Sequence, residues 1–506
     1  MVTLPASSLL PLLAILVPAV GGLIVFTAKR WHRGAGIFGV GACAVATLAI
    51  TLLMAHGASV ATPMEAKLFQ LVPPLWVALR VDAMGALFAV TIAAMFVLAL
   101  VHAVGYLPDD RRQWCFHGYA LASLGAMMGV ALAANMITLL LFYELFSLLA
   151  YPLIVHERTP SAFRAGVKYL VYIFSGGALI FCGVVLVQGI AASTEFLPGG
   201  ILQHVEPRGV TVATWWLLLA GFGVKAALMP LHGWVPDAHP AAPAPFSALL
   251  SGVMVAAGIF GILRFSLEIF GPTLLVQLGV LPWLAGIASV AVLAGAVLAV
   301  PEDDLKRRLA WSTISQMAYV TLALSLLHPT AFAGALVHIT HHAFFKGGLF
   351  FCAGMMIALT GVRRISQMRG LGWRMPWMGA TLTLLALAMT GMPPLSGFVG
   401  KWTIATGMVQ ASGFAHLAVL VIGSLLAALY LWPVIYRIWQ QPEPGDPAHE
   451  PDKIEALPSG FYWMLIAVLT CGLITLVLGV AAGLPGFPLD LAQRAAESLL
   501  GPPAWK

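Results

Sequence analysis

The sequence predicts an all-α integral membrane protein of about 14 transmembrane helices, with two inverted five-helix repeats and two broken helices. Three observations predict this fold. The chain of 506 residues is 60% hydrophobic and only 9% charged, whereas soluble domains are roughly 25% charged. Apolar segments long enough to cross a bilayer recur along the chain. Two of these segments combine an internal lysine with prolines.

The predicted membrane spans follow one another with mostly short loops between them. A helix needs about 20 predominantly apolar residues to cross the hydrocarbon core of a bilayer. Such segments lie near residues 9–27, 35–54, 82–105, 116–133, 136–155, 166–190, 212–231, 243–266, 274–299, 309–327, 331–359, 376–406, 413–436 and 460–483. No Lys or Arg precedes the first segment, so we expect it to be a membrane span and not a cleavable signal peptide.

Lys and Arg concentrate in alternate loops, which predicts the orientation of the chain. Because cytoplasmic loops carry the excess of Lys and Arg, we expect the basic loops in the cytoplasm and both termini outside, in a bacterial inner (plasma) membrane. The net charge of +6 therefore does not indicate nucleic-acid binding. The Pro-rich stretch 440–458 is predicted to be a cytoplasmic loop, and 191–211 the largest outer loop. The basic loops are 29–33, 109–112, 157–168, 302–308 and 363–374.

Redox, ATP and metal chemistry are not expected within this chain. No GxGxxG or P-loop motif precedes a helix, and no segment could form a soluble catalytic domain. We therefore expect no cofactor. The cysteines show no CxxC and no metal spacing, so they are predicted to be small apolar residues of the spans and we expect no metal site. They are Cys43, Cys115, Cys182, Cys352 and Cys471.

Six of the ionisable residues inside the predicted spans are candidates for transport chemistry. Such groups are costly at membrane depth unless they face water, protein or one another. Snorkelling or a helix-packing ion pair explains a single residue of this kind, but several unrelated spans each carry one here. The set therefore indicates ion transport. Its members are Glu144, Lys225, His338, His342, Lys346 and Lys401.

Three of these residues recur every four positions in the segment "HITHHAFFKGGLFF", residues 338–351. This spacing places His338, His342 and Lys346 on one helix face with about 6 Å between successive groups. Water can bridge such gaps, and imidazole can accept a proton on one nitrogen while releasing one from the other. His341 points about 100° away from His342 and is expected to pack or cap locally. A metal site is disfavoured because the span has neither HExxH nor a carboxylate.

Two spans contain both a lysine and a proline break. Pro230 follows Lys225, and Pro393-Pro394 precedes Lys401. Matched interrupted helices in two halves of a chain are typical of inverted-repeat transporters. We expect helices 1–3 in residues 1–110, the first repeat (helices 4–8) in 111–270 and the second (helices 9–13) in 271–440. A cytoplasmic loop, the last helix and a short tail follow in 441–506.

These segments resemble the antiporter-like proton-conducting subunits shared by respiratory complex I, Mrp-type cation/proton antiporters and membrane-bound hydrogenases. The resemblance runs from about residue 80 to 440. It implies a fourteen-helix fold and partners that are other membrane subunits and the lipid bilayer. The transported ion would be H⁺, with Na⁺ left open, and the host could be an NADH-quinone oxidoreductase-type complex. The matching segments are "FYELFSLLAYPLI", "KAALMPLHGWVPDAHPAAPAPFSALLSGVM", "DDLKRRLAWSTISQMAYV", "HITHHAFFKGGLFF" and "GMPPLSGFVGKW".

The resemblance also implies roles for the six residues. Glu144 and Lys225 would form the charge pair of one half-channel, the α-helical His338–His342–Lys346 face would be the central relay, and Lys401 the terminal site of the other half-channel. One departure is Ala256, where relatives often carry a lysine. The link from Lys225 to the histidines must then run through water and hydroxyls such as Ser247 and Ser251, or be slower, or be absent.

Two other functions remain open from the sequence. A self-contained monovalent cation/proton antiporter needs a dedicated site, typically of buried carboxylates, and Glu144 is the only convincing one within a span. A scaffold subunit without transport is suggested by the missing lysine at Ala256, but the retained histidines and Lys401 argue against it.

Overall fold

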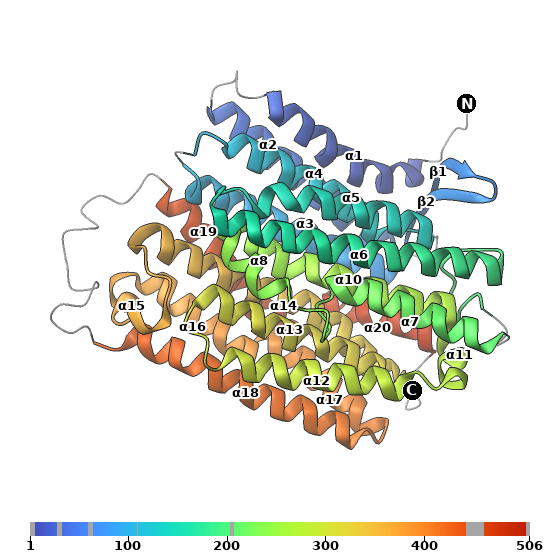
Figure 1. The fold of residues 1–506 in the computed structure, drawn as a ribbon. Coiled ribbons are helices and arrows are strands. Elements are labelled where there is room, and N and C mark those ends of the chain that lie inside the picture. The colour runs from blue at the N-terminus through green and yellow to red at the C-terminus, as the bar shows by residue number, and fades with distance from the viewer. Residues whose placement is uncertain are drawn as a thin grey trace.

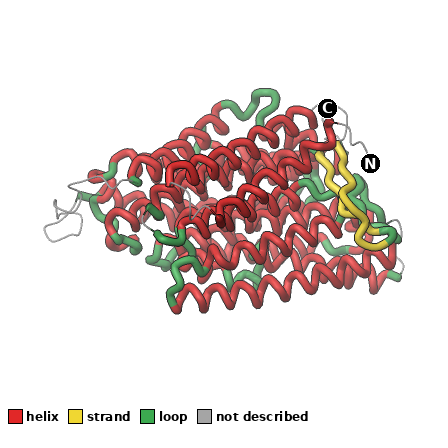
Figure 2. Tube along the Cα trace, turned by 90° about the horizontal axis from the view of Figure 1, so that it is seen from above, coloured by secondary structure: helices red, strands yellow, loops and turns green. Residues whose placement is uncertain are grey.

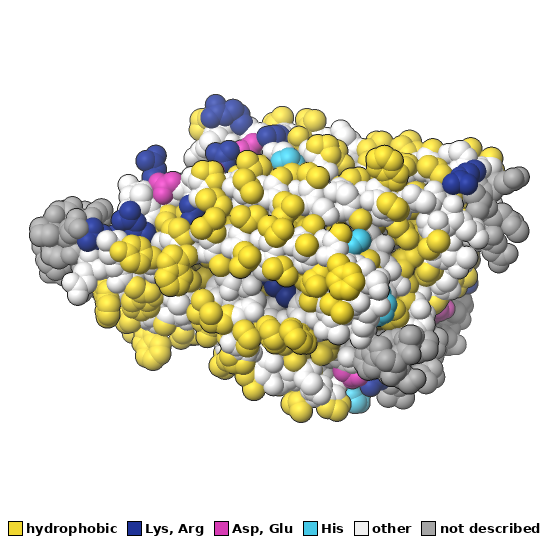
Figure 3. Space-filling model, turned by 90° about the horizontal axis from the view of Figure 1, so that it is seen from below, with side chains coloured by type: hydrophobic (Ala, Val, Ile, Leu, Met, Phe, Trp, Pro, Cys, Tyr) yellow, Lys and Arg dark blue, Asp and Glu magenta, His cyan; other side chains and the backbone are white. Residues whose placement is uncertain are grey.

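The structure, a computed structural model, describes residues 6–27, 33–58, 64–108, 110–202, 207–441 and 460–501. Long helices lie side by side, and a β-hairpin lies at one end of the bundle (Figures 1 and 2). The predicted loops 29–33 and 440–458 fall almost entirely outside the described residues. Hydrophobic side chains cover the middle of the face in Figure 3, as a membrane protein requires.

The first half of the chain contains the β-hairpin and the helices α1 to α11. Its strands β1 (Met64–Val72) and β2 (Leu75–Val81) pair antiparallel. Its helices are α1 (Ala6–Thr27), α2 (Arg33–Ala58), α3 (Ala83–Tyr106), α4 (Gln113–Ala131), α5 (Met136–Ile154), α6 (Pro160–Ala191), α7 (Arg208–Lys225), α8 (Val235–Ala241), α9 (Ala244–Leu249), α10 (Val255–Arg264) and α11 (Gly271–Leu278). The π-helical turns η2 (Leu250–Met254) and η3 (Phe265–Phe270) join α9 to α11 into one segment.

The second half begins with the helix after α11. Its helices are α12 (Leu281–Ala299), α13 (Leu305–Leu324), α14 (Pro329–Thr360), α15 (Leu371–Arg374), α16 (Pro376–Thr390), α17 (Ser396–Gln410), α18 (Phe414–Trp439), α19 (Phe461–Val480) and α20 (Pro488–Leu500), with a short 3-10 turn η4 (Ile365–Gln367) before α15.

Ten helical segments among the described residues are long and apolar enough to cross a membrane. The predicted spans near 116–133, 212–231, 309–327 and 376–406 are not among them. A break shortens the helices near 212–231 and 376–406. The first turn of α13 carries three basic residues, which lowers its apolar character. The fold is therefore largely helical and membrane-spanning, as predicted. The hairpin of β1 and β2 departs from the predicted all-α class, and the number 14 stays a prediction.

Both predicted breaks have a local cause. After α7 ends at Lys225, the chain runs through turns that contain Pro230 before α8 starts at Val235. Proline removes a backbone donor and clashes with the preceding turn, so the helix does not continue. In the second half, α16 ends at Gly391, whose φ of 95° suits glycine. Pro393 and Pro394 then separate α16 from α17.

Helix α14 lies at the centre of the bundle (Figure 1). It packs against α3, α9, α13, α16, α17, α19 and α20. All its residues from Ala331 to Met356 are buried. A polar side chain on α14 therefore meets only protein or enclosed water, which is the condition that makes an ionisable group tolerable at this depth.

Candidate functional site

Lys225 is the last residue of α7 and lies buried against α5, with 2% of its surface exposed. Its Nζ donates a hydrogen bond to Ser147 Oγ. The ammonium also lies 4.5 Å from the ring centroid of Tyr143 and 3.5 Å from that of Phe146. These side chains that contact the Lys225 ammonium therefore all come from α5. They lie before and after Glu144 in the chain, the residue predicted to form a charge pair with Lys225.

Glu144 is half-buried on α5 and interacts electrostatically with Lys225. Within the described chain, however, no hydrogen bond or ion pair joins the two, and Glu144 Oε1 has no partner. The carboxylate instead borders a cavity of about 370 Å³ that opens on the outside of the bundle. The cavity is also lined by Leu140, Leu141, Phe174, Gly177, Ala178 and Phe181.

The central group on α14 has the predicted spacing. The rings of His338 and His342 lie 6.2 Å apart between centroids. Both are fully buried, and none of the four ring nitrogens makes a hydrogen bond within the described part of the chain, although His338 lies near the backbone of Gln316 on α13. Lys346 Nζ donates to Ser312 Oγ and to Leu309 O at 3.3 Å, both on α13. His341 lies near the backbone of Ser396 at the start of α17.

Lys401 lies on α17 directly after the second break. Its Nζ donates to Met389 O at 2.9 Å and Thr390 O at 3.2 Å. These carbonyls belong to the last turn of α16, where no further helical N–H is available to bond them. The Lys401 ammonium also lies 5.4 Å from the ring centroid of Tyr319 on α13. The break therefore creates the acceptors that hold this buried lysine.

Helix α17 brings Lys401 close to the histidines. A Cβ added to Gly400 would lie 3.1 Å from His338 Cα, so the two backbones approach closely at the residue before Lys401. The ring of Tyr319 lies edge-on to His338, with 6.0 Å between centroids. The structure thus gathers His338, Tyr319 and Lys401 at one end of the α14 face and Lys346 at the other.

The segment between Lys225 and α14 carries the hydroxyls noted in the sequence, but both bond elsewhere. Ser247 Oγ donates to His239 O at 2.8 Å, and Ser251 Oγ pairs with Thr313 Oγ1 of α13 at 2.6 Å. Ala256 is fully buried. Ser251 therefore continues the polar lining towards α13, whereas Ser247 bonds backbone carbonyls and neither serine bonds Lys225.

Two buried ionisable residues near Lys346 were not singled out from the sequence. His239 on α8 is fully buried, stacks on Phe350 at 5.1 Å between centroids, and has no partner for either ring nitrogen in the described chain. It interacts electrostatically with Lys306 and Lys346. Lys306 Nζ donates to Ala242 O at 2.5 Å and to Pro240 O at 3.4 Å. The sequence did not single out His239 because it lies in the proline-rich break after α7, outside the predicted spans. Lys306 was assigned to the basic loop 302–308.

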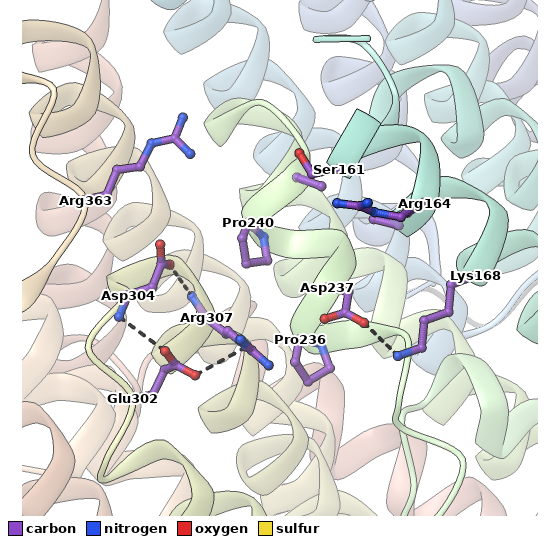
Figure 4. Close-up of a pocket in the computed structure, with 12 residues that line it drawn as sticks. Ser161, Arg164, Lys168, Pro236, Asp237, Pro240, Glu302, Asp304, Arg307 and Arg363 are labelled. Atoms are coloured by element: carbon purple, nitrogen blue, oxygen red, sulfur yellow. Dashed lines mark hydrogen bonds and ion pairs between the residues drawn. The ribbon is translucent and has the colours of Figure 1, made fainter. Parts of the chain in front are cut away.

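A polar cavity of about 550 Å³ lies beside α8 (Figure 4). Three of the predicted cytoplasmic loops, 157–168, 302–308 and 363–374, contribute to its wall. Lys168 pairs with Asp237 at 2.6 Å on one side of this cavity, and Arg307 pairs with Glu302 at 3.3 Å on the other. The wall of the cavity includes Asp237 and Pro240 of α8, which lie within two residues of the buried His239.

Comparisons with known proteins show which family the chain belongs to. Residues 133–427 match the family described as NADH:quinone oxidoreductase/Mrp antiporter, TM. The chain is 34% identical over 423 residues to NADH-quinone oxidoreductase subunit N of Desulforudis audaxviator (strain MP104C), covering 81% of this chain and 83% of the relative. It is 33% identical over 347 residues to Hydrogenase-4 component B of Escherichia coli (strain K12), covering 64% of this chain and 50% of that protein.

The fold also matches a solved membrane complex. A chain of the Mrp complex from Dietzia sp. DQ12-45-1b superimposes with a TM-score of 0.85 at 21% identity, covering 98% of this chain and 97% of that chain. At this identity the likeness concerns the fold.

Proposed function

Since the chain belongs to the NADH:quinone oxidoreductase/Mrp antiporter family and is an antiporter-like membrane subunit, we propose that it carries protons across the membrane as part of a multisubunit complex. The observation that carries this proposal is the buried face of α14. Its histidine nitrogens make no hydrogen bonds within the described chain. At one end of the face Lys346 bonds Ser312 on α13, and beside the other end Lys401 bonds Met389 O on α16.

The proposed route joins two half-channels. A proton enters from the cytoplasm near Lys225, whose protonation Glu144 influences through its charge. It then moves laterally along the α14 face and leaves outward near Lys401. The rings of His338 and His342 lie 6.2 Å apart between centroids, so transfer between them requires a bridging water or a movement of the rings. The face consists of His338, His342 and Lys346.

The cavity beside α8 supports a cytoplasmic entrance at the centre of the protein. It is polar, and it lies close to His239, which interacts electrostatically with Lys346. This entrance suits a chain with Ala256 in place of a cation, because a proton could reach Lys346 without crossing from Lys225. Lys306 and His239 are then members of the route.

The proposal includes the finer topology. We place 14 transmembrane helices in the chain, with inverted repeats in 111–270 and 271–440 and both termini outside. The two breaks support the repeats, because each lies next to a buried lysine, Lys225 or Lys401. The basic loops that meet at the α8 cavity support a cytoplasmic location for that side.

The energy for transport has to come from partner subunits. Moving one charge against 100 mV costs about 2.3 kcal/mol. A partner that closes or widens the gap between Glu144 and Lys225 would change the protonation of both, because an opposite charge favours each charged form. The cavity at Glu144 opens on the outside of the bundle, so a neighbouring subunit can reach the carboxylate.

The decisive test is a comparison of two neighbouring histidines. His342→Gln keeps a polar side chain but removes protonation near neutral pH. We expect proton transport by the assembled complex in sealed vesicles, followed with a pH-sensitive dye, to fall by about 10²-fold or more, as for other positioned proton-transfer groups. His341→Gln, about 100° around α14 from His342, is the matched control and should transport nearly normally.

Assembly of the complex is measured in parallel for both variants. Transport at the wild-type rate with His342→Gln, or equal damage from His341→Gln, would assign these histidines to packing. Lys346→Arg should fail like His342→Gln, since guanidinium does not release its proton in this pH range.

A further inference from the structure

The two lysines beside the breaks share a feature that does not follow from their hydrogen bonds. Lys225 lies over the rings of Tyr143 and Phe146, and Lys401 over the ring of Tyr319. A ring face attracts a cation within about 6 Å of its centroid. Among the described residues, Lys346 has no ring in such a position.

The number of acceptors shows why the rings matter. An ammonium has three N–H donors. Within the described chain, Lys225 bonds only Ser147, and Lys401 bonds two carbonyls. All three rings are buried, with at most 1% of their surface exposed. Of these two lysines, Lys225 thus has fewer acceptors and more rings, with its Nζ 3.5 Å from the ring centroid of Phe146 and 4.5 Å from that of Tyr143.

The rings come from corresponding places in the two halves. Helix α5 is the second helix of the proposed repeat 111–270 and carries Tyr143 and Phe146. Helix α13 is the second long helix of the proposed repeat 271–440 and carries Tyr319. The same kind of contact therefore occurs twice, each time between this second helix and the lysine beside a break.

We propose that Phe146, Tyr143 and Tyr319 are positioning residues that hold the two lysines as ammonium ions through the faces of their rings, in place of water or a carboxylate. This inference rests on the proposed proton route. A ring differs from a carboxylate because it favours the charge without competing for the proton. Its attraction is also modest, so the lysine stays able to release the proton to the next group.

Stepwise fluorination of Phe146 tests the ring directly. Fluorine withdraws electron density and weakens the attraction of the ring face for a cation, while the ring keeps nearly the same shape. Phenylalanine with one, two or three fluorine atoms is incorporated at position 146, and proton transport by the assembled complex is measured from pH 6 to pH 10. We expect the alkaline limit of transport to move stepwise to lower pH, by about 0.5 to 1.5 pH units in total.

The same series at Phe96 is the matched control. Phe96 on α3 is equally buried, and no lysine or arginine of the described chain lies over its ring. Fluorination there should leave the pH profile unchanged. An unchanged profile across the Phe146 series, or the same shift at Phe96, would overturn the proposal.

Substitutions of Tyr319 are the second test, because they distinguish the role of the ring from the role of the hydroxyl. Tyr319→Phe keeps the ring and should leave the pH profile unchanged, whereas Tyr319→Leu should shift it to lower pH. Loss of transport with Tyr319→Phe would show that the hydroxyl carries the proton and would contradict the role of the ring.

The His342→Gln variant is measured alongside these series. If it stays inactive while fluorination has no effect, only the role of the rings is wrong. If it transports normally, the proton route itself is wrong.

Discussion

Lys225 is held by Ser147 and two rings, whereas Glu144 keeps one oxygen without a partner in the described chain. The two charges therefore interact across a gap and are not locked in a salt bridge. A locked buried pair would cost several kcal/mol to break. The open arrangement leaves both groups able to change protonation when their separation changes.

This arrangement predicts different outcomes for two substitutions of Glu144. Glu144→Gln removes the charge, so coupled pumping by the complex should fall by about 10²-fold or more. Glu144→Asp keeps the charge and should retain part of the activity. The measurement is the rate of pumping per turnover of the complex in sealed membranes. Equal loss in both variants would indicate that Glu144 acts through packing.

Lys225→Ala should abolish pumping while the complex still assembles. The ammonium is removed, and Glu144 can then become neutral by protonation, so no unpaired charge is left behind. The same vesicle measurement tests this variant, with the amount of assembled complex as its control. Normal pumping by Lys225→Ala would remove the first half-channel from the route.

Helices α14 and α17 approach so closely that glycines form the contact. A Cβ on Gly407 would lie 2.2 Å from Ala331 N, and one on Gly334 would lie 2.5 Å from Ile404 N. Backbone atoms cannot move aside as a flexible side chain can. This contact holds Lys401 beside His338, so the packing of the two helices and the geometry of the proposed outer half-channel depend on the same residues.

Gly407→Ala should therefore separate α14 from α17. Overpacking of this kind costs about 1–3 kcal/mol, so the midpoint of thermal unfolding of the purified protein in detergent should fall. Gly39→Ala on α2 is the matched control. No atom lies within 4 Å of a Cβ added there, and alanine is the better helix former. A fall in the midpoint with Gly39→Ala as large as with Gly407→Ala would contradict this explanation.

The arrangement of the whole chain places the α8 cavity and the β-hairpin towards opposite ends of the helices. The predicted cytoplasmic loops 157–168, 302–308 and 363–374 contribute to the cavity. Leu197, in the predicted outer loop, donates its N–H to Glu268 O near the β-hairpin end. The orientation in the membrane therefore decides which side supplies the proton and which side receives it.

Cysteine labelling tests this orientation. In a chain whose five native cysteines are replaced, Ser161→Cys and Gln367→Cys should react with a membrane-impermeant maleimide only from the cytoplasmic side. Leu197→Cys should react only from outside. All three positions are at the surface of the protein. Labelling of Ser161→Cys and Leu197→Cys from the same side would contradict the predicted spans.

Local patterns were enough to predict the helical membrane fold, the two breaks and the spacing on α14. Hydrophobic length, proline and the helical period act within a few residues of the chain, so they can be read without knowledge of the packing. The distance of 6.2 Å between the rings of His338 and His342 follows from their positions on one helix.

Only the tertiary structure decided which groups these residues meet. The predicted charge pair of Lys225 with Glu144 stays a prediction, while the structure shows that the ammonium bonds Ser147 and lies over Phe146. His239 became part of the site because α8 packs beside α13 and α14 carries Phe350 against it. Such contacts join residues far apart in the chain, and they depend on how the helices pack and how each side chain is turned. No local pattern in the sequence contains that information.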